Sequence, residues 1–171
     1  MSEINFDPIV LTQSLVKCAS ITPEDDGALT VVENHLKAIG FDCYPLNFSG
    51  NNSYEVKNLF ATIGNEGKHF AYAGHTDVVP IGNESSWKYP PFSAKIDGEK
   101  LYGRGSEDMK SSVACFISAT KKFLDKYKEL PGKISFIITG DEERDSVNGT
   151  PKILEWASKN NYKFDHCLVG E

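Results

Sequence analysis

Residues 69–77 read HFAYAGHTD, a short apolar run that ends in polar side chains. The apolar part predicts a buried strand, because a few consecutive apolar residues between polar segments are typical of strands that are covered on both faces. His75 and Asp77 follow where this strand ends. The sequence therefore predicts a buried strand that delivers polar groups to its own end.

The same arrangement recurs twice further along the chain. The apolar run 134–139 leads into a pair of glutamates, Glu142 and Glu143, and a last short run, 166–169, is followed by Glu171. In open α/β sheets, functional groups gather beyond the carboxyl ends of the strands. We therefore expect these acids to lie in one layer with the polar end of the first strand.

Segments with helical spacing of apolar residues separate the strands. Helices are predicted over 8–19, 27–39, 107–127 and 148–159, further strands over 41–48 and 58–63, and a hairpin over 95–102. This alternation indicates an α/β fold with a three-layer architecture, in which a mixed, partly parallel sheet is flanked by helices. The helix that opens at Asp108 adds another acid to the layer of strand ends.

Composition excludes several classes of partner. The chain has 171 residues, with 18 Lys plus Arg against 24 Asp plus Glu, so its formal net charge is −6. This balance offers no basic surface for nucleic acid or for an anionic membrane. The N-terminus is acidic and lacks an apolar segment, and no run of about 18 apolar residues occurs in the chain. We therefore expect one globular domain in the cytoplasm.

The predicted layer of strand ends concentrates carboxylates around one histidine. Such carboxylates repel one another and resist desolvation unless a cation lies among them. One imidazole with several carboxylates suits zinc or a similar transition ion, and the surplus of acids suggests two metals that share a bridging acid. Asp77 would orient the imidazole of His75, and Glu142 would act as a general base. Taken singly, a histidine at a strand end is usually a satisfied polar residue, and a glutamate pair is usually solvated surface.

Four ordered motifs resemble those of a known enzyme family. They are AGHTDVVP (73–80), LYGRGSEDMK (101–110), DEE with a following NGT (141–150) and VGE (169–171). Over essentially its whole length the chain is similar to the succinyl-diaminopimelate desuccinylases, which belong to a dizinc group of metallopeptidases that includes aminoacylases and carboxypeptidases. The NGT triplet and the complete first motif favour the desuccinylases within this group.

The resemblance implies a centre with two zinc ions, although cobalt or manganese could use the same ligands. It assigns His75 and Glu171 to the first zinc, Glu143 to the second and Asp108 to both. Glu142 would be the general base or acid, and Asp77 would be the acid behind His75. The peptide bond between Asp108 and Met109 is commonly cis in the family.

The implied reaction is hydrolysis of a small molecule, N-succinyl-LL-2,6-diaminopimelate, to succinate and LL-2,6-diaminopimelate in lysine biosynthesis, by a protein that is a homodimer when complete. Family members are longer, because a smaller dimerisation domain follows the glutamate equivalent to Glu171 and the catalytic domain then resumes. Residues 1–171 would thus be the N-terminal portion of the catalytic domain, without a histidine ligand of the second zinc, and weakly active or inactive alone. Two alternatives stay open: an N-acyl amino acid deacylase or dipeptidase, and a non-catalytic zinc-binding fragment.

Several charged residues outside the implied ligand set are interpreted as structural. The histidines His35, His69 and His166 lie outside the motifs and are predicted to be ordinary core or surface residues. Lys110 is predicted to be a solvated helix residue. Arg104 is interpreted as bridging loop backbone or an acid, with a substrate carboxylate as the alternative partner.

Overall fold

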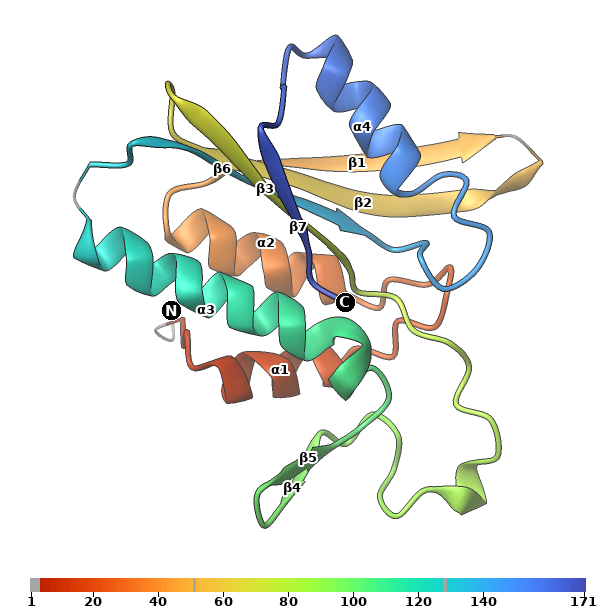
Figure 1. The fold of residues 1–171 in the computed structure, drawn as a ribbon. Helices are drawn as coiled ribbons and strands as arrows, with labels where there is room; N and C mark the ends of the chain where they lie inside the picture. The colour runs from red at the N-terminus through yellow and green to blue at the C-terminus, as the bar shows by residue number, and fades with distance from the viewer. Residues whose placement is uncertain (1–3, 51, 128) are drawn as a thin grey trace.

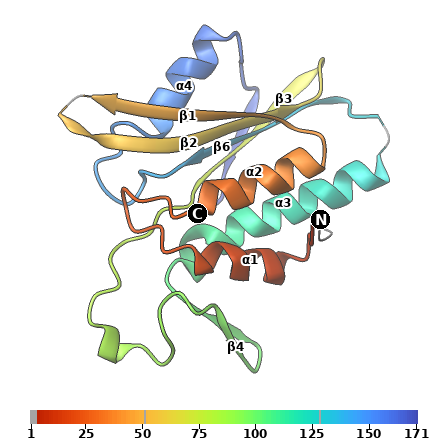
Figure 2. The same cartoon turned by 180° about the vertical axis from the view of Figure 1, so that it is seen from behind.

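The computed structural model describes residues 4–50, 52–127 and 129–171. Its main sheet has five strands: β1 (Asp42–Gly50), β2 (Ser53–Ile63), β3 (Lys68–His75), β6 (Gly132–Thr139) and β7 (His166–Val169). The helices are α1 (Pro8–Lys17), α2 (Ala28–Ala38), α3 (Ser111–Lys126) and α4 (Thr150–Lys159), and a small separate hairpin is formed by β4 (Lys95–Asp97) and β5 (Lys100–Tyr102). Helices α1 to α3 lie on one side of the sheet and α4 on the other (Figures 1 and 2), which confirms the three-layer α/β prediction.

The sheet is mixed, with strand order β1-β2-β6-β3-β7. β1 and β2 pair antiparallel, as do β2 and β6, whereas β3 pairs parallel with both β6 and β7. Because β3, β6 and β7 run in one direction, their carboxyl ends meet at the same edge of the sheet. His75 pairs with Thr139 at this edge, so the residues that follow β3 and β6 emerge side by side.

Local sequence signals set the ends of the first two helices. The carboxylate of Asp7 caps α1 by accepting hydrogen bonds from the backbone N–H groups of Ile9 at 2.8 Å and Val10 at 3.2 Å. After α2, Gly40 adopts a left-handed conformation with φ of 90°, which residues with a Cβ rarely adopt. The chain can therefore turn there from α2 into β1.

The sheet separates two apolar cores. The larger core lies between the sheet and α1 to α3 and includes Leu15, Leu36, Tyr72, Ile117 and Phe136. The smaller core lies under α4 and includes Phe60, Ala71, Ile137 and Ile153. Neighbouring residues of β3 and β6 thus enter opposite cores, which explains why both strands are continuously apolar in sequence.

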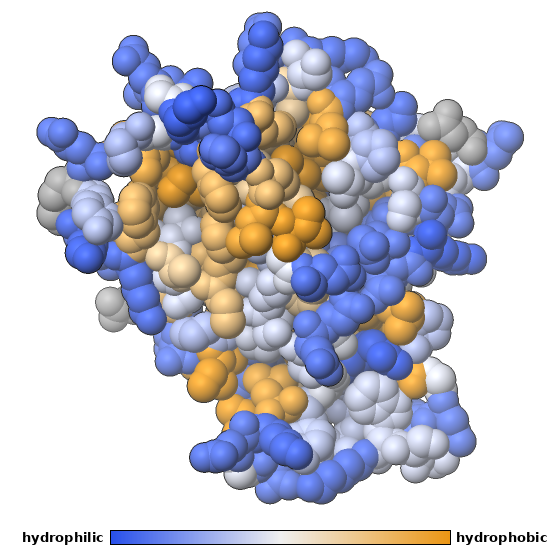
Figure 3. Space-filling model, viewed as in Figure 1, coloured by the Kyte–Doolittle hydropathy of each residue, from blue (hydrophilic) through white to orange (hydrophobic). Residues whose placement is uncertain are grey.

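β7 is an edge strand whose four residues are all exposed. Its apolar side chains Leu168 and Val169 are 46% and 62% exposed. Figure 3 shows apolar residues gathered across the middle of the face on which β7 lies in front in Figure 1. This strand is consequently held by pairing with β3 rather than by burial of its side chains.

The first β-hairpin is longer than the sequence predicts. β2 begins at Ser53 instead of residue 58, and β1 extends to Gly50 instead of residue 48. Gly50 pairs with Ser53 beyond an irregularity in register after Phe48. Polar residues continue the strands because both lie at the exposed end of the hairpin; Asn51 lies outside the described residues.

The helix predicted over 107–127 begins only at Ser111. Residues Ser106–Lys110 form an irregular turn, η2, in which Asp108 and Met109 have non-helical backbone angles and are joined by a cis peptide bond. The apolar character of Met109 fits helical spacing, but its side chain packs against Gly74 on β3. Asp108 consequently lies in a bend before α3 and not in its first turn.

No helix among the described residues is both long enough and apolar enough to cross a membrane. The acidic N-terminus, from which a cytoplasmic location was inferred, includes Met1, Ser2 and Glu3, which lie outside the described residues. The cytoplasmic location therefore stays a prediction.

Candidate metal centre

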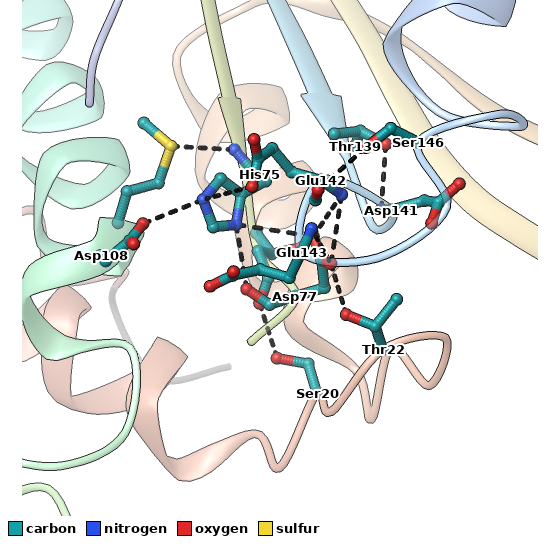
Figure 4. A network of polar contacts seen from close by, with 12 residues as sticks. Ser20, Thr22, His75, Asp77, Asp108, Thr139, Asp141, Glu142, Glu143 and Ser146 are labelled. Carbon is teal, nitrogen blue, oxygen red and sulfur yellow. Dashed lines mark hydrogen bonds and ion pairs between the residues drawn. The ribbon is translucent and has the colours of Figure 1, made fainter. Parts of the chain in front are cut away.

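His75 lies at the centre of the layer of strand ends. It is the last residue of β3, and its backbone N–H donates a hydrogen bond to Met109 Sδ at 3.2 Å. Its Nε2 lies 3.1 Å from Asp108 Oδ1, 3.8 Å from Glu171 Oε1 and 3.9 Å from Glu142 Oε2. Figure 4 shows Asp108 approaching this ring from the helical side and Glu142 from the loop after β6. Three elements thus converge on one nitrogen atom.

The imidazole is buried, but the carboxylates around it are open to solvent. The His75 side chain is 1% exposed, whereas those of Asp108, Glu142 and Glu171 are 57%, 45% and 48% exposed. Ligand atoms of His75, Asp108 and Glu143 lie within 4.8 Å of one another, and the same holds for His75, Glu142 and Glu171. The described residues therefore form a possible metal-binding group with access for a small molecule.

The tautomer of His75 follows from its other ring nitrogen. Nδ1 lies 2.9 Å from the backbone carbonyl oxygen of Asp77, which can only accept, so Nδ1 carries the proton. In the neutral ring, Nε2 then directs a lone pair at the carboxylate oxygens. This contact is repulsive unless a proton or a cation lies between them. One imidazole nitrogen with several carboxylate oxygens is a donor set that divalent transition ions accept, so the residues fit a metal ion.

The same geometry shifts several pKa values. Burial opposes protonation of His75, but hydrogen bonding to Asp77 and the negative charges of Asp77 and Glu142 outweigh it and raise the pKa of His75 to about 9. Burial would raise the pKa of Asp77, yet hydrogen bonds from His75 and Thr22 hold it below its ordinary value. Burial, reinforced by neighbouring carboxylates, raises the pKa of Glu142 and of Glu143.

The carboxylate of Asp77 ties the end of β3 to the loop after β6. It is fully buried, and its Oδ1 lies 3.5 Å from His75 Nδ1. It accepts hydrogen bonds from the backbone N–H groups of Glu142 at 3.2 Å and Glu143 at 3.1 Å, and from Thr22 Oγ1 at 2.6 Å. Asp77 thus lies behind the imidazole, as expected. It also fixes the backbone of both glutamates, a role that the sequence did not indicate.

The segment 18–22, which follows α1, holds the residues around the centre by hydrogen bonds. The sequence indicated no role for it. Ser20 Oγ donates a hydrogen bond to the backbone carbonyl of Thr76 at 2.6 Å, and Thr22 donates to Asp77. Lys110 is fully buried and donates from Nζ to the backbone carbonyl of Cys18 at 2.8 Å, so the prediction of a solvated lysine is wrong. Burial lowers the pKa of Lys110 to about 8. The motif around Asp108 was a signal for Lys110, but nothing local pointed to Ser20 or Thr22.

Asp141 plays a comparable supporting part for the glutamate loop. Its buried carboxylate accepts hydrogen bonds from Tyr54 Oη at 2.5 Å and from the backbone N–H groups of Val147 at 3.1 Å and Asn148 at 3.3 Å. These contacts close residues 141–148 into a compact loop on the end of the first hairpin. The DEE and NGT motif marked this loop in the sequence but not its partner Tyr54, which lies 87 residues earlier.

All the implied ligands lie around His75, but the structure groups them differently from the implied allocation. Glu143 joins His75 and Asp108, whereas Glu171 joins His75 and Glu142. The assignment of each carboxylate to a particular ion therefore stays a prediction.

A mixed α/β sheet that gathers one histidine and several carboxylates beyond its parallel strands defines a class of protein with a metal-type hydrolytic centre. Comparison with known families agrees with this class. The family described as Peptidase family M20/M25/M40 matches residues 71–171, and the chain belongs to this family.

Among curated proteins, the chain is similar to succinyl-diaminopimelate desuccinylases. It is 49% identical over 166 residues to that of Hydrogenovibrio crunogenus and 44% identical over 171 residues to that of Beijerinckia indica. These alignments cover 96% and 100% of this chain but 43% and 44% of the relatives. The chain thus spans less than half the length of the relatives it matches.

Solved structures with the same fold include two peptidases. Human carnosine dipeptidase 1 is 24% identical with a TM-score of 0.79, over 96% of this chain and 38% of that one. The M20 family metallo-carboxypeptidase Sso-CP2 from Sulfolobus solfataricus is 26% identical with a TM-score of 0.75, over 99% of this chain and 37% of that one. The first likeness establishes the fold, and the second is to a metal-dependent member of the same family.

Proposed function

We propose that this chain carries the larger part of the metal centre of a zinc-dependent amide hydrolase. The proposed substrate is N-succinyl-LL-2,6-diaminopimelate, which reacts with water to give succinate and LL-2,6-diaminopimelate in lysine biosynthesis. The observation that carries the proposal is the buried Nε2 of His75, which lies within 4 Å of three carboxylates. The identity of 44–49% to desuccinylases supports the choice of substrate.

Zinc would be held by the imidazole and the carboxylates that surround it. The proposed ligands are His75, Asp108, Glu143 and Glu171, with Asp108 shared between two ions. When bound, zinc supplies Lewis acidity that polarises the amide carbonyl and lowers the pKa of water. Cobalt or manganese would fit the same donors.

Glu142 would move the proton in this reaction. Its raised pKa and its half-exposed carboxylate suit a group that takes a proton from the attacking water and gives it to the departing amine nitrogen. A bond from the water oxygen to the acyl carbon forms while the carbon–nitrogen bond breaks. Asp77 would act as a positioning residue, because its carbonyl orients His75 and its carboxylate anchors the backbone of Glu142.

A calorimetric zinc titration of the 171-residue chain at neutral pH tests the ligand set. We expect wild type to bind zinc tightly, His75→Ala to abolish this binding and Glu143→Ala to leave one site. Glu99→Ala is the matched control, because Glu99 is an exposed acid in the β4–β5 turn. Absence of zinc binding, or a His75 variant that binds like wild type, would overturn the assignment.

A second candidate is an N-acyl amino acid deacylase or dipeptidase. It is favoured by the structural similarity to a metallo-carboxypeptidase at 26% identity. A substrate panel of N-succinyl-diaminopimelate, N-acetyl amino acids and dipeptides separates the candidates by which amine is released fastest. Zinc binding without hydrolysis of any of them would favour the remaining alternative, a non-catalytic zinc-binding fragment.

The proposed biological unit is larger than this chain. Residues 1–171 would be the N-terminal portion of a catalytic domain in a cytoplasmic homodimer, with a smaller dimerisation domain and the rest of the catalytic domain elsewhere in the protein. The coverage of 43–44% of the relatives supports this proposal. Light scattering of the full gene product, beside hydrolysis rates for that product and for this chain, would test it.

A further inference from the structure

A pocket of about 250 Å³ lies directly beside the candidate metal centre. Its lining consists of Gly103, Arg104, Gly105, Ser106, Glu107, Asp108 and Glu143. Two of these residues, Asp108 and Glu143, are proposed zinc ligands, so a molecule bound at the centre has immediate access to the pocket. Arg104 is the only basic residue in this lining.

Arg104 is held in place by its backbone and by its side chain. Its backbone N–H donates to the carbonyl of Pro91 at 2.8 Å, and its Nη2 donates to the carbonyl of Pro80 at 3.2 Å. The guanidinium carbon lies 5.1 Å from the centre of the Trp87 ring, a distance typical of cation–π contacts. The guanidinium is therefore oriented before any ligand arrives.

The glycines on either side of Arg104 let its loop pack closely against the scaffold. A Cβ on Gly103 would lie 2.3 Å from Val16 Cγ1, and a Cβ on Gly105 would lie 2.5 Å from Val78 Cγ1. Gly105 also has a φ of 77°, which side chains disfavour. This packing places Arg104 at the rim of the centre with little freedom to move.

The donors of Arg104 are only partly used. Its Nε is buried without a hydrogen-bond partner, and within the described ranges no carboxylate forms an ion pair with its guanidinium. The interpretation that Arg104 bridges an acid is therefore not supported, although its contact with loop backbone is present. A planar guanidinium with free donors matches a carboxylate, which it can bind through two parallel hydrogen bonds.

We propose that Arg104 binds the free carboxylate at the far end of an N-acyl group whose amide lies at the metal centre. This inference rests on the proposed function and specifies its substrate class: acyl groups that end in a carboxylate, such as succinyl. A neutral acyl group of equal length leaves the guanidinium without its partner. Arg104 would thus select between acidic and neutral acyl chains.

Two probes of the same length test this selection on the zinc-loaded chain. Succinamate carries an amide at one end and a carboxylate at the other, whereas butanamide lacks the carboxylate. The sequence contains two arginines, Arg104 and Arg144, so the arginine Nε–H region of an NMR spectrum holds two signals. Arg144 lies 5.5 Å from the ring of Tyr54 and outside the pocket, and it serves as the internal reference.

We expect succinamate to shift the Arg104 signal in a saturable manner while the Arg144 signal stays in place. Butanamide should move neither signal. The proposal is overturned if succinamate leaves Arg104 unchanged, if both arginines shift equally, or if butanamide shifts Arg104 as strongly. A shift confined to Arg104 also distinguishes its role from binding of the carboxylate to zinc alone.

Variants measure how much of the affinity for succinamate depends on the planar guanidinium of Arg104. Arg104→Met should raise the Kd for succinamate roughly tenfold or more, because a charge-assisted hydrogen bond is lost. Arg104→Lys keeps the charge but cannot form two parallel hydrogen bonds with a carboxylate, so an intermediate Kd is expected. Arg144→Met makes the same change of charge outside the pocket and should leave the Kd unchanged. If circular dichroism shows that Arg104→Met does not fold, Arg104→Lys decides, and a wild-type Kd for it overturns the proposal.

Failure of this inference can be distinguished from failure of the proposed function. Zinc binding and hydrolysis of the N-succinyl substrate with no effect at Arg104 would overturn only the role of Arg104. Succinamate binding that depends on Arg104, without hydrolysis of any N-succinyl amide by the full gene product, would overturn the proposed reaction and retain the carboxylate site.

Discussion

Two histidines on β3 have nearly the same burial but opposite chemistry. His69 is the second residue of the strand and His75 is the last, and six residues of separation place both on one face. They are 3% and 1% exposed. The ring nitrogens of His69 lie 2.8 Å from the carbonyl of Lys163 and 2.7 Å from Ser135 Oγ, and burial lowers its pKa. The pKa of His75 is instead raised to about 9.

The difference lies in the carboxylates around the ring: Asp77, beside Nδ1, contributes most to the raised pKa of His75, and Glu142, near Nε2, adds to it. Both nitrogens of His69 have neutral partners, so the ring is a satisfied core residue, as the sequence analysis predicted. In His75 only Nδ1 has such a partner, and Nε2 faces carboxylates. Burial alone therefore does not separate the two histidines, whereas the carboxylates around His75 do.

Among substitutions that test this difference between the two histidines, the largest expected effect is on metal binding. Asp77→Asn removes the negative charge behind His75 and weakens the acceptor that anchors both glutamates, so zinc affinity should fall about 10- to 100-fold. His69→Leu should leave zinc affinity unchanged. Calorimetric zinc titrations of both variants provide the check. An equal loss of zinc affinity in the two variants would contradict a specific role for Asp77, because any substitution along β3 would then have the same effect.

His69→Leu should instead reduce the stability of the fold. The substitution removes the hydrogen bonds of His69 to the carbonyl of Lys163 and to Ser135, whose hydroxyl keeps its bond to Thr62. The loss of two hydrogen bonds is expected to lower the free energy of unfolding by about 1–3 kcal/mol. Urea unfolding measures this quantity. A variant as stable as wild type would mean that water or neighbouring groups replace both hydrogen bonds.

Thr22→Val tests the surroundings of His75 and should have a smaller effect. The lost hydroxyl donates to Asp77 at 2.6 Å, so stability should fall by about 1 kcal/mol and zinc affinity by less than in Asp77→Asn. Thr30→Val is the control, because Thr30 is an exposed residue of α2 and such changes usually stay within about 0.5 kcal/mol. Zinc affinity equal to wild type would limit Thr22 to a role in folding.

The smallest expected effect is a pH dependence that comes from His69. Its pKa in the folded chain lies below the ordinary value of 6.5, so the unfolded chain binds the proton more readily. The stabilisation is thus complete above about pH 6.5 and decreases as the pH falls below it. Urea unfolding at about pH 7.5 and pH 5.5 should show the difference between wild type and His69→Leu narrowing at the lower pH. A constant difference would contradict the lowered pKa.

The sequence was sufficient for the parts of the site that depend on local patterns. Apolar runs located β3, β6 and β7, and the rule for parallel strands correctly placed His75, Glu142 and Glu171 at one edge. The turn at Asp108 was missed because Met109 fits a helical pattern, while its actual contact is with His75, 34 residues away in sequence.

The supporting residues were missed for the same physical reason. Thr22 contacts a carboxylate 55 residues away, and Lys110 contacts a carbonyl 92 residues away. Hydrophobic periodicity records which face of an element is covered, but it contains no information on which distant polar group a side chain will meet. Such partners become visible only once the fold is known.

The strand order has a consequence for how the chain folds during synthesis. β6 lies between β2 and β3, and its Ile137 pairs with Phe60 and Ala73, both made more than 60 residues earlier. At ribosomal speeds of about 5–20 residues per second, β2 and β3 wait several seconds for their shared partner. Pairings this distant also slow folding itself. We therefore expect the nascent chain to expose its two apolar strands until residue 139 has left the ribosome, the stage at which chaperone binding and aggregation compete most strongly with folding.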